Sequence, residues 1–349
     1  MNSLALKEEK LETNKKQRSN PILASTLIIV GIIAIILFTL VSIVVGAADI
    51  SLDTVWNTFF HFNPDNTQHQ VIYQMRLPRA LVVGVVGAAL AVSGAIMQGM
   101  TRNPLASPGL MGVSAGASFM LIIAFAFFPE SPYHFLIVFS FIGAAIGATL
   151  VYGTAALSRG GLTPVGLALA GAVVSALLGS FGGAINILFE LSQDLMFWYA
   201  GGVAGSKWIH VQLLFPLVII GLVGALMISR SITILSLGEE VATGLGQKTV
   251  WVKAIGSIIV LILTGAAVST AGAVGFIGLV IPHITRYLIG VDYRWVIPCS
   301  AVLGGLLLIL ADIGARLVNP PFETPVGVLT AIIGVPFFLY LARTDRREV

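Results

Sequence analysis

The sequence contains few charged residues and a single cysteine. Of its 349 residues, 10% are charged and 57% are hydrophobic, and the mean hydropathy is +0.97. A soluble domain could not stay in solution with so few charges. The lone Cys299 excludes an intrachain disulfide and any metal site built from several cysteines, and its place in an apolar run predicts a buried thiol. The composition is therefore that of a membrane protein.

The N-terminal segment lacks the pattern of a cleavable signal peptide. Residues 1–21 are mostly polar, of mixed charge and without apolar periodicity, which predicts a cytosolic tail. The apolar run that follows, residues 22–46, is longer than the core of a signal peptide and long enough to span a bilayer. We therefore expect this run to remain as the first membrane anchor.

Apolar runs of spanning length predict an all-α polytopic membrane protein with about ten transmembrane helices. The runs cover residues 22–46, 77–100, 108–128, 134–157, 164–188, 211–229, 250–269, 272–290, 296–317 and 325–342. The predicted ten-span domain therefore covers residues 22–342, and residues 343–349 form a second cytosolic tail. The boundary near Thr270 is the tightest, because residues 250–290 are only just enough for two crossings and a turn.

The basic residues are unevenly divided between the two sides of this topology. Fifteen of the 19 Lys and Arg residues fall on the side of the N-terminus, and the other side holds only Arg76, Arg79, Lys207 and Arg316. The positive-inside rule then places both termini in the cytosol. The net charge of +3 reflects this asymmetry and gives no reason to expect nucleic acid as a partner.

Small residues indicate close helix packing and a duplicated half. The pairs Gly143/Gly147 and Gly179/Gly183 have the spacing that lets helix backbones approach in lipid. The segments GAALAVSGAI (87–96) and GAAVSTAGAV (265–274) align without gaps at an offset of 178. Duplicated halves are common in transporters, where the substrate path lies between them.

No motif for catalysis or for metal binding fits its required context. GVSAG (112–116) matches the serine nucleophile pattern, but it opens a predicted membrane helix and no triad partners are evident. GLGQKT (244–249) lacks the glycine that directly precedes lysine in a phosphate loop. Asp312 and Arg316, one helical turn apart, can pair near membrane depth. The sequence predicts a non-enzymatic protein without cofactor or metal, whose ATP-driven work would come from another subunit.

Two other function classes stay open from the residues alone. An ion-coupled carrier would need uptake that follows a proton or sodium gradient, although such relays usually show more buried ionisable groups than this sequence has. An intramembrane hydrolase would need activity that is lost when Ser114 is changed.

The polar stretch SLGEEVATGLGQK, residues 236–248, interrupts the apolar pattern between the sixth and seventh predicted spans. A short helix over residues 239–243, ending at Gly244 or Gly246, would lie along the membrane surface. Its composition alone favours a solvated cytosolic loop instead.

Four segments resemble the signature blocks of the iron-siderophore and vitamin B12 import permeases of bacterial ABC transporters. They are RLPRALVVGVVGAALAVSGAIMQGMTRNPLASPGLMGVSAGA (76–117), LSLGEEVATGLG (235–246), GAVGFIGLVIPHITR (272–286) and ADIGAR (311–316). They keep the family's order, and the resemblance covers essentially residues 22–342. It implies the type II ABC importer permease architecture, with ten spans in the bacterial plasma (inner) membrane and both termini in the cytosol.

The resemblance also implies three functional regions. Coupling helices at about 235–247 would contact the ATPase through Glu239, Glu240, Ala242 and Gly244. Arginines that receive carboxylates of a binding protein would be Arg76, Arg79 and Arg316. An inner gate would involve Asn103, Leu105, Thr163, Pro164 and Val165. At 163–165 this sequence has a proline where the B12 branch has small polar residues, so it departs from the family there.

The partners implied by the resemblance are those of a complete importer. They are a second permease subunit, identical or different, two ATP-binding cassette ATPase subunits, an extracytoplasmic substrate-binding protein and the lipid bilayer. A ferric siderophore is the expected cargo, and vitamin B12 or haem is the alternative.

Overall fold

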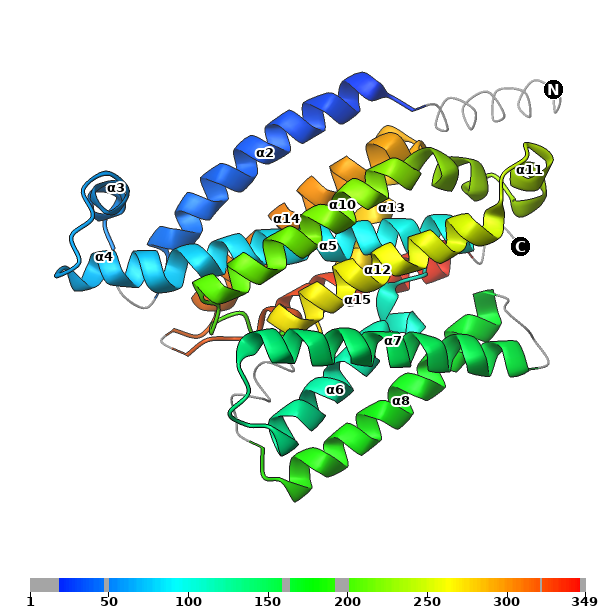
Figure 1. The fold of residues 1–349 in the computed structure, drawn as a ribbon. Helices are drawn as coiled ribbons and strands as arrows, with labels where there is room; N and C mark the ends of the chain where they lie inside the picture. The colour runs from blue at the N-terminus through cyan, green and yellow to red at the C-terminus, as the bar shows by residue number, and fades with distance from the viewer. Residues whose placement is uncertain (1–18, 47–49, 159–163, 192–200, 321, 346–349) are drawn as a thin grey trace.

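Ten apolar helices form the body of the protein in the computed structural model, which describes residues 19–46, 50–158, 164–191, 201–320 and 322–345 (Figure 1). They are α2 (Pro21–Val44), α5 (Leu77–Thr101), α6 (Val113–Phe127), α7 (Tyr133–Leu157), α8 (Pro164–Leu188), α10 (Trp208–Ser236), α12 (Thr249–Ala271), α13 (Ile277–Ile289), α14 (Tyr293–Leu317) and α15 (Val326–Asp345). Seven helices in the described residues are long and apolar enough to cross a membrane, and three apolar helices are shorter. The predicted all-α class and the ten-helix order are confirmed.

Short elements lie at the two ends of these helices. α3 (Leu52–Phe60), α4 (Thr67–Val71) and the π-helical turn η1 (Ile72–Arg76) lead into α5, and the 3-10 turn η2 (Pro108–Met111) leads into α6. α11 (Glu239–Gly244) lies between α10 and α12 at the opposite end from α3 (Figure 1). We call these the α3 end and the α11 end. The first described residues of α2 and the last of α15 lie at the α11 end.

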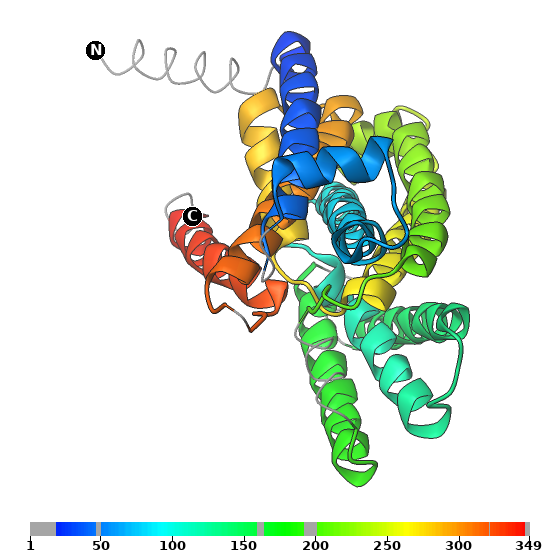
Figure 2. The same ribbon diagram turned by 90° about the vertical axis from the view of Figure 1, so that its left-hand side faces the viewer.

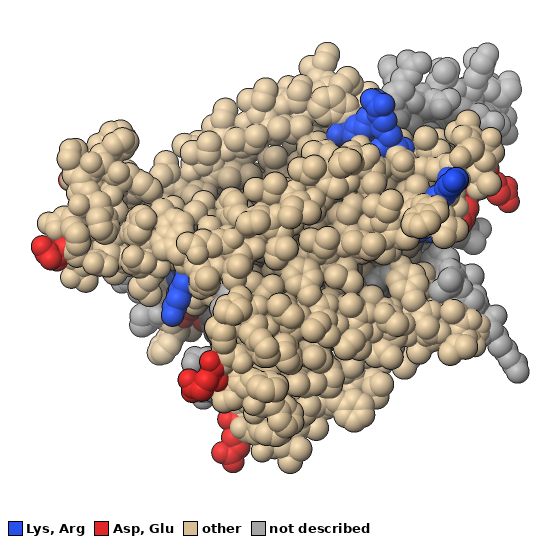
Figure 3. Space-filling view, in the orientation of Figure 1, with Lys and Arg blue, Asp and Glu red and all other residues tan. Residues whose placement is uncertain are grey.

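Charged side chains gather toward these two ends. Figure 3 shows Lys, Arg, Asp and Glu near the α3 end and the α11 end of one face, with a wide uncharged band between them. Such a band is the surface that lipid tails require. The predicted tails 1–21 and 343–349 lie largely outside the described residues, which begin at Ser19 and end at Asp345.

α5 is the central helix of the bundle (Figure 2). It packs against α10, α12, α13 and α14, and most of its side chains are buried. Close approach depends on its glycines: a Cβ at Gly87 would lie 2.3 Å from the Gly304 carbonyl oxygen, and one at Gly94 would lie 1.8 Å from that of Gly278. Backbone-to-backbone packing of this kind replaces the hydrophobic effect, which gives little drive between helices in lipid.

Two sets of four helices repeat the same order and the same packing. Each has a long helix, a short helix, a second long helix and a fourth helix: α5 to α8, and α12 to α15. In each set the short helix contacts both helices that follow it. The offset of 178 is not the structural correspondence, because it sets α13 against residues 99–111, which hold the end of α5, a loop and η2. The link between α5 and α6 is longer than the link between α12 and α13, so an alignment without gaps cannot match both pairs of helices.

Both short helices begin after a residue in the left-handed conformation. Gly112 precedes α6 with φ +70°, and Phe276 precedes α13 with φ +68°. The chain break after α12 therefore falls at residues 272–276, beyond the predicted Thr270. The two breaks meet around a cavity of about 210 Å³ that Ser107 and Gly275 help to line. Non-helical backbone at membrane depth is tolerated where protein or a cavity surrounds it.

α10 is longer than the predicted span, which ended at residue 229. It continues to Ser236 because Ile232 and Leu235 keep its apolar face buried in the core. The polar interruption therefore begins only at Leu237–Gly238, where Gly238 adopts φ +136°.

The two glycine pairs behave differently. A Cβ at Gly143 would lie 2.2 Å from the Gly116 carbonyl oxygen, and one at Gly147 would lie 2.1 Å from that of Gly112, so this pair packs α7 onto α6 as predicted. A Cβ at Gly179 or Gly183 would meet nothing within 4 Å in the described structure. The second pair therefore leaves a small-residue face of α8 open.

Replacing Gly147 by alanine should destabilise the isolated subunit, because the added methyl group meets backbone that cannot rotate away. We expect overpacking to cost about 1–3 kcal/mol. Gly183→Ala is the matched control and should cost nothing, since alanine favours a helix by up to about 1 kcal/mol over glycine. Thermal unfolding of both variants in detergent checks this, and equal melting temperatures would contradict it.

Candidate functional sites at the two ends of the bundle

At the α3 end, two arginines cap the last turn of α2. The Nη1 atom of Arg76 donates to the carbonyl oxygens of Ile43 at 2.6 Å and Val44 at 2.7 Å. The Nη1 atom of Arg316 donates to the carbonyl oxygen of Ser42 at 2.7 Å. The last carbonyls of a helix have no partner within it, and the helix dipole makes that end negative. Both guanidinium groups therefore satisfy backbone oxygens that would otherwise be orphaned.

A buried carboxylate, Asp312, joins two of the arginines. Its side chain is 1% exposed. The Nε and Nη2 atoms of Arg79 donate to its Oδ1 at 3.0 and 2.8 Å, and the Nη2 atom of Arg316 donates to its Oδ2. The predicted pairing of Asp312 with Arg316 is confirmed. Because burial makes an unpaired charge costly, this carboxylate and its arginines depend on one another.

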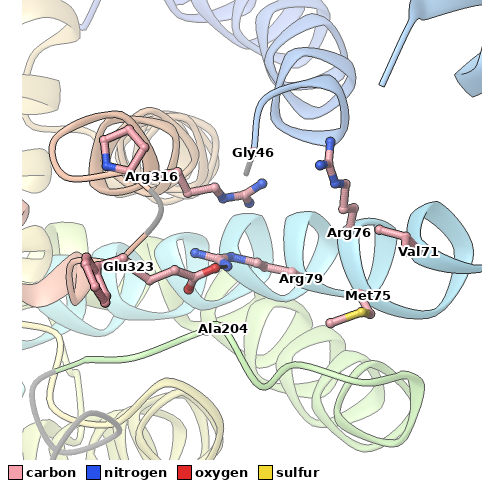
Figure 4. Close-up of a pocket in the computed structure, with 10 residues that line it drawn as sticks. Gly46, Val71, Met75, Arg76, Arg79, Ala204, Arg316 and Glu323 are labelled. Atoms are coloured by element: carbon pink, nitrogen blue, oxygen red, sulfur yellow. Dashed lines mark hydrogen bonds and ion pairs between the residues drawn. The ribbon is translucent and has the colours of Figure 1, made fainter. Parts of the chain in front are cut away.

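A second carboxylate reaches Arg79 from the rim of the same cluster. The Nη1 atom of Arg79 donates to Oε1 of Glu323 at 2.6 Å, and the Glu323 side chain is 38% exposed. A cavity of about 330 Å³ adjoins this contact and is lined by Arg76, Arg79, Arg316 and Glu323, among others (Figure 4). Three guanidinium groups face two carboxylates, so the site carries an excess positive charge.

The structure brings the three predicted docking arginines together, but not as free surface groups. Arg76, Arg79 and Arg316 are between 7% and 8% exposed, and each is bonded within the chain. An external carboxylate would therefore have to approach through the cavity. Glu323 was not predicted, because it lies in the link between α14 and α15 and belongs to no motif.

At the α11 end, the four predicted ATPase contacts divide into two groups. Glu240 and Gly244 are exposed on α11. Ala242 is fully buried in the core, and Glu239 accepts two hydrogen bonds of 2.8 Å from Nζ of Lys253 on α12. Ala242 and Glu239 therefore hold α11 against the bundle. The predicted short helix over residues 239–243 is confirmed as α11.

The hydrogen bonds from Lys253 lower the pKa of Glu239. A carboxylate whose pKa is lowered on folding stabilises the folded state above its ordinary pKa, and this contribution is lost only as the pH falls through the lowered value. Glu239 therefore stays ionised at neutral and mildly acidic pH. Both side chains of the pair are more than two-fifths exposed, at 46% and 41%, so the energy of the pair is small and screened.

Three exposed apolar residues on the segment 236–248 were not predicted. Val241 is 47% exposed and Leu245 is 67% exposed, one helical turn apart, and Leu237 just before α11 is 61% exposed. The recurrence of apolar residues every four positions was the available signal. It gives α11 an apolar surface beside Glu240.

Two of the five predicted gate residues, Asn103 and Leu105, lie on the loop that follows α5. Oδ1 of Asn103 accepts a hydrogen bond of 2.9 Å from the backbone N–H of Leu105, which forms a tight turn after α5. The Leu105 side chain packs against Leu279 and Val280 of α13. Thr163 lies outside the described residues, and Pro164 begins α8, followed by Val165.

A buried polar contact near these residues connects α5 to α13. Nη2 of Arg286 donates to Oε1 of Gln98 at 2.5 Å, and Nε2 of Gln98 donates to the carbonyl oxygens of Gly278 at 3.1 Å and Leu279 at 3.2 Å. Pro282 has no N–H for the Gly278 carbonyl four residues earlier, so Gln98 supplies the missing donor. Pro282 lies inside a predicted span, and this was the sequence signal that the Gly278 carbonyl needs another donor.

The described residues offer little for catalysis. They contain no group of three His, Cys, Asp or Glu side chains that could hold a metal ion. Ser114 lines the 210 Å³ cavity between the two chain breaks, and the described lining of that cavity contains neither histidine nor acid. The serine therefore has no base within that cavity to activate it.

Known proteins are similar to this chain in sequence and in fold. The model of the FecCD transport family matches residues 32–344. The iron(3+)-hydroxamate import system permease protein FhuB of Bacillus subtilis (strain 168) is 59% identical over 324 residues, 93% of this chain and 84% of FhuB. The iron-uptake system permease protein FeuB of the same organism is 48% identical over 315 residues, 90% of this chain and 94% of FeuB. A solved metal-chelate type ABC transporter in an inward-facing conformation has a TM-score of 0.79 and 28% identity, covering 93% of this chain and 100% of that one.

Replacing Asp312 by asparagine should strongly destabilise the fold, because Arg79 and Arg316 would lose their buried counter-charge. Breaking a buried pair on one side costs about 3–5 kcal/mol. The control Asp53→Asn removes an exposed carboxylate that is bonded only to Asn57 among the described side chains. It should cost less than about 1 kcal/mol. Unfolding of both variants in detergent measures the difference, and similar stabilities would show that Asp312 does not hold the cluster together.

Proposed function

The chain belongs to the FecCD transport family, and from that premise we propose that it carries ferric siderophores across the bacterial plasma membrane as the permease of an ABC importer. Its role as a multi-pass permease, not an enzyme, follows from the family and from the fold. The assignment of the cargo rests on one observation, the high identity to a permease named for iron(3+)-hydroxamate import. Vitamin B12 or haem is the alternative cargo.

The α11 end faces the cytosol in this proposal. The positive-inside rule supports this orientation, because most of the basic residues that the structure describes lie at or near helix ends on the side of α11. They are Arg102, Arg230, Lys248, Lys253, Arg286, Arg294 and Arg343. The beginning of α2 and the end of α15 lie at that end too, so both termini would be cytosolic (Figure 1). The arginine cluster at the α3 end then faces the extracytoplasmic binding protein.

α11 is the coupling helix that contacts the ATPase subunit. Glu240, Val241, Gly244 and Leu245 are available on its exposed side. Closure of the ATPase subunits on ATP would move α11, and its bonds to α12 through Lys253 would pass the movement on as a rigid-body change. The permease itself then needs no nucleotide site.

The open face of α8 is the contact for the second permease subunit. The exposed residues Ala172, Ala176, Gly179 and Gly183 share one side of this helix, and in the described structure the last two have no neighbour where a Cβ would lie. Small residues at this spacing let two helices pack closely in lipid. Figure 2 shows α8 at the edge of the molecule, with the central helices on the other side of it.

Asn103 and Leu105, with residues 163–165, form the inner gate of the pathway. This assignment is supported by the position of Leu105, which packs on α13 close to Phe276 and the break in the chain. A shift of α13 would therefore move the loop that carries Asn103.

Uptake should need ATP and the intact apolar surface of α11. In proteoliposomes that contain the permease, its ATPase and its binding protein, transport of a ferric hydroxamate should require ATP and survive a protonophore. Transport that follows an ion gradient without ATP would instead support the ion-coupled class. Ferric hydroxamate, haem and vitamin B12 compared in one assay identify the cargo.

Leu245→Ala should weaken ATPase association about fivefold or more, the effect of truncating a side chain that contributes over about 1 kcal/mol to an interface. Leu52→Ala is the matched control, since Leu52 is 72% exposed at the α3 end. Co-purification and uptake measured for both variants test the assignment. Equal association of the two variants would place the ATPase elsewhere.

Gly183→Leu should separate the two permease subunits without unfolding either, because the larger side chain fills the small-residue face. Gly153→Leu is the control, since Gly153 on α7 is also exposed and equally open. Light scattering in detergent should show more monomer for Gly183→Leu only. A dimer that tolerates leucine at 183 would mean that α8 does not form the contact.

A further inference from the structure

Glu323 is the one partly exposed carboxylate among the described residues of the arginine cluster. Asp312 is 1% exposed and is enclosed by Arg79 and Arg316, whereas the Glu323 side chain is 38% exposed. Both carboxylates bind the same guanidinium group. An external carboxylate could therefore replace Glu323 at Arg79 more easily than it could replace Asp312.

The geometry at Arg79 separates a permanent contact from an exchangeable one. Its Nε and Nη2 atoms are engaged by Asp312, and only Nη1 is bonded to Glu323, at 2.6 Å. This Nη1 contact adjoins the 330 Å³ cavity (Figure 4). A carboxylate that entered the cavity would reach Arg79 at the position that Glu323 holds.

The backbone around Glu323 is fixed, so its side chain can leave without a loop movement. The N–H of Thr324 donates to the carbonyl oxygen of Ala315 at 3.3 Å, and the N–H of Val326 donates to that of Gly201 at 3.1 Å. Rotation about the side-chain bonds of Glu323 is enough to release Arg79. A half-exposed ion pair of this kind is weak and therefore exchanges readily.

We infer that Glu323 is an internal stand-in for the carboxylate of the binding protein, and that docking displaces it from Arg79. The inference rests on the proposed role of the arginine cluster in receiving that protein. Asp312 stays bound to Nε and Nη2 of Arg79 during the exchange, so the buried cation is never without a counter-charge. It also explains how arginines that are nearly buried can take part in docking.

Removing the stand-in should tighten docking. Because the Glu323 side chain is partly exposed, we expect its pair with Arg79 to favour the closed form over the open form by a factor of only about one to five. The apparent affinity for the binding protein scales with the open fraction. Glu323→Gln should therefore lower the Kd for the binding protein about two- to sixfold, measured by surface plasmon resonance on permease in nanodiscs. Glu323→Asp, whose carboxylate is one methylene shorter, should tighten docking as well without any change of charge.

The control is Glu130→Gln, which makes the same change of charge in the link between α6 and α7, outside the arginine cluster. A general electrostatic effect would alter both variants alike, and equal affinities for Glu323→Gln and Glu130→Gln would overturn the inference. Arg79→Lys distinguishes docking at the arginine cluster from the displacement of Glu323. Lost affinity in Arg79→Lys with no gain in either Glu323 variant would leave docking standing and reject the stand-in. No effect in any of the three variants would reject both.

Discussion

Inside a bilayer no water is available to a polar group, so each backbone atom freed from a helix and each charge must find its partner within the protein. The carbonyl oxygens at the end of α2 are satisfied by Arg76 and Arg316, and the carbonyl that Pro282 leaves without a donor is satisfied by Gln98. The same requirement brings the two chain breaks, before α6 and before α13, into contact around one small cavity. Much of the polar chemistry of this protein is therefore located where helices end or break.

Because of this constraint, the arginine cluster has a structural role. Arg79 belongs to α5 and Asp312 to α14, so their pairing fixes these two helices to each other at the α3 end. Gln98 and Arg286 fix α5 to α13 toward the other end of α5. Between the two contacts, glycines allow the backbones of these helices to touch. The central helices are thus held together along their whole length, from the arginine cluster at the α3 end to the contact of Gln98 with Arg286.

Much of the fold could be predicted from the sequence, because the length of an apolar run is fixed by the thickness of the bilayer. The ten helices and α11 are found close to their predicted positions. Such a pattern does not show which face of a helix packs against a neighbouring helix. Nothing in the residue type distinguishes Gly147, which touches another backbone, from Gly183, which touches nothing. For the same reason the burial of Ala242 and the contact of Glu323 with Arg79 could not be read from motifs, since both depend on segments distant in sequence.

The packing also indicates which parts can move against each other. α6, α7 and α8 contact one another closely and reach the central helices mainly through α12 and the η2 segment. α12 carries Lys253, which pairs with Glu239 of α11, so α12 contacts both α11 and the α6–α8 group. A displacement of α11 that moves α12 would therefore be passed to α6 and α7, which α12 contacts directly, and also to α5, against which α12 packs. The polar contacts that join α5 to α13 and α14 resist such a movement. Since α8 carries the open small-residue face proposed as the contact for a second permease subunit, such a displacement would move that face while the arginine cluster keeps its geometry.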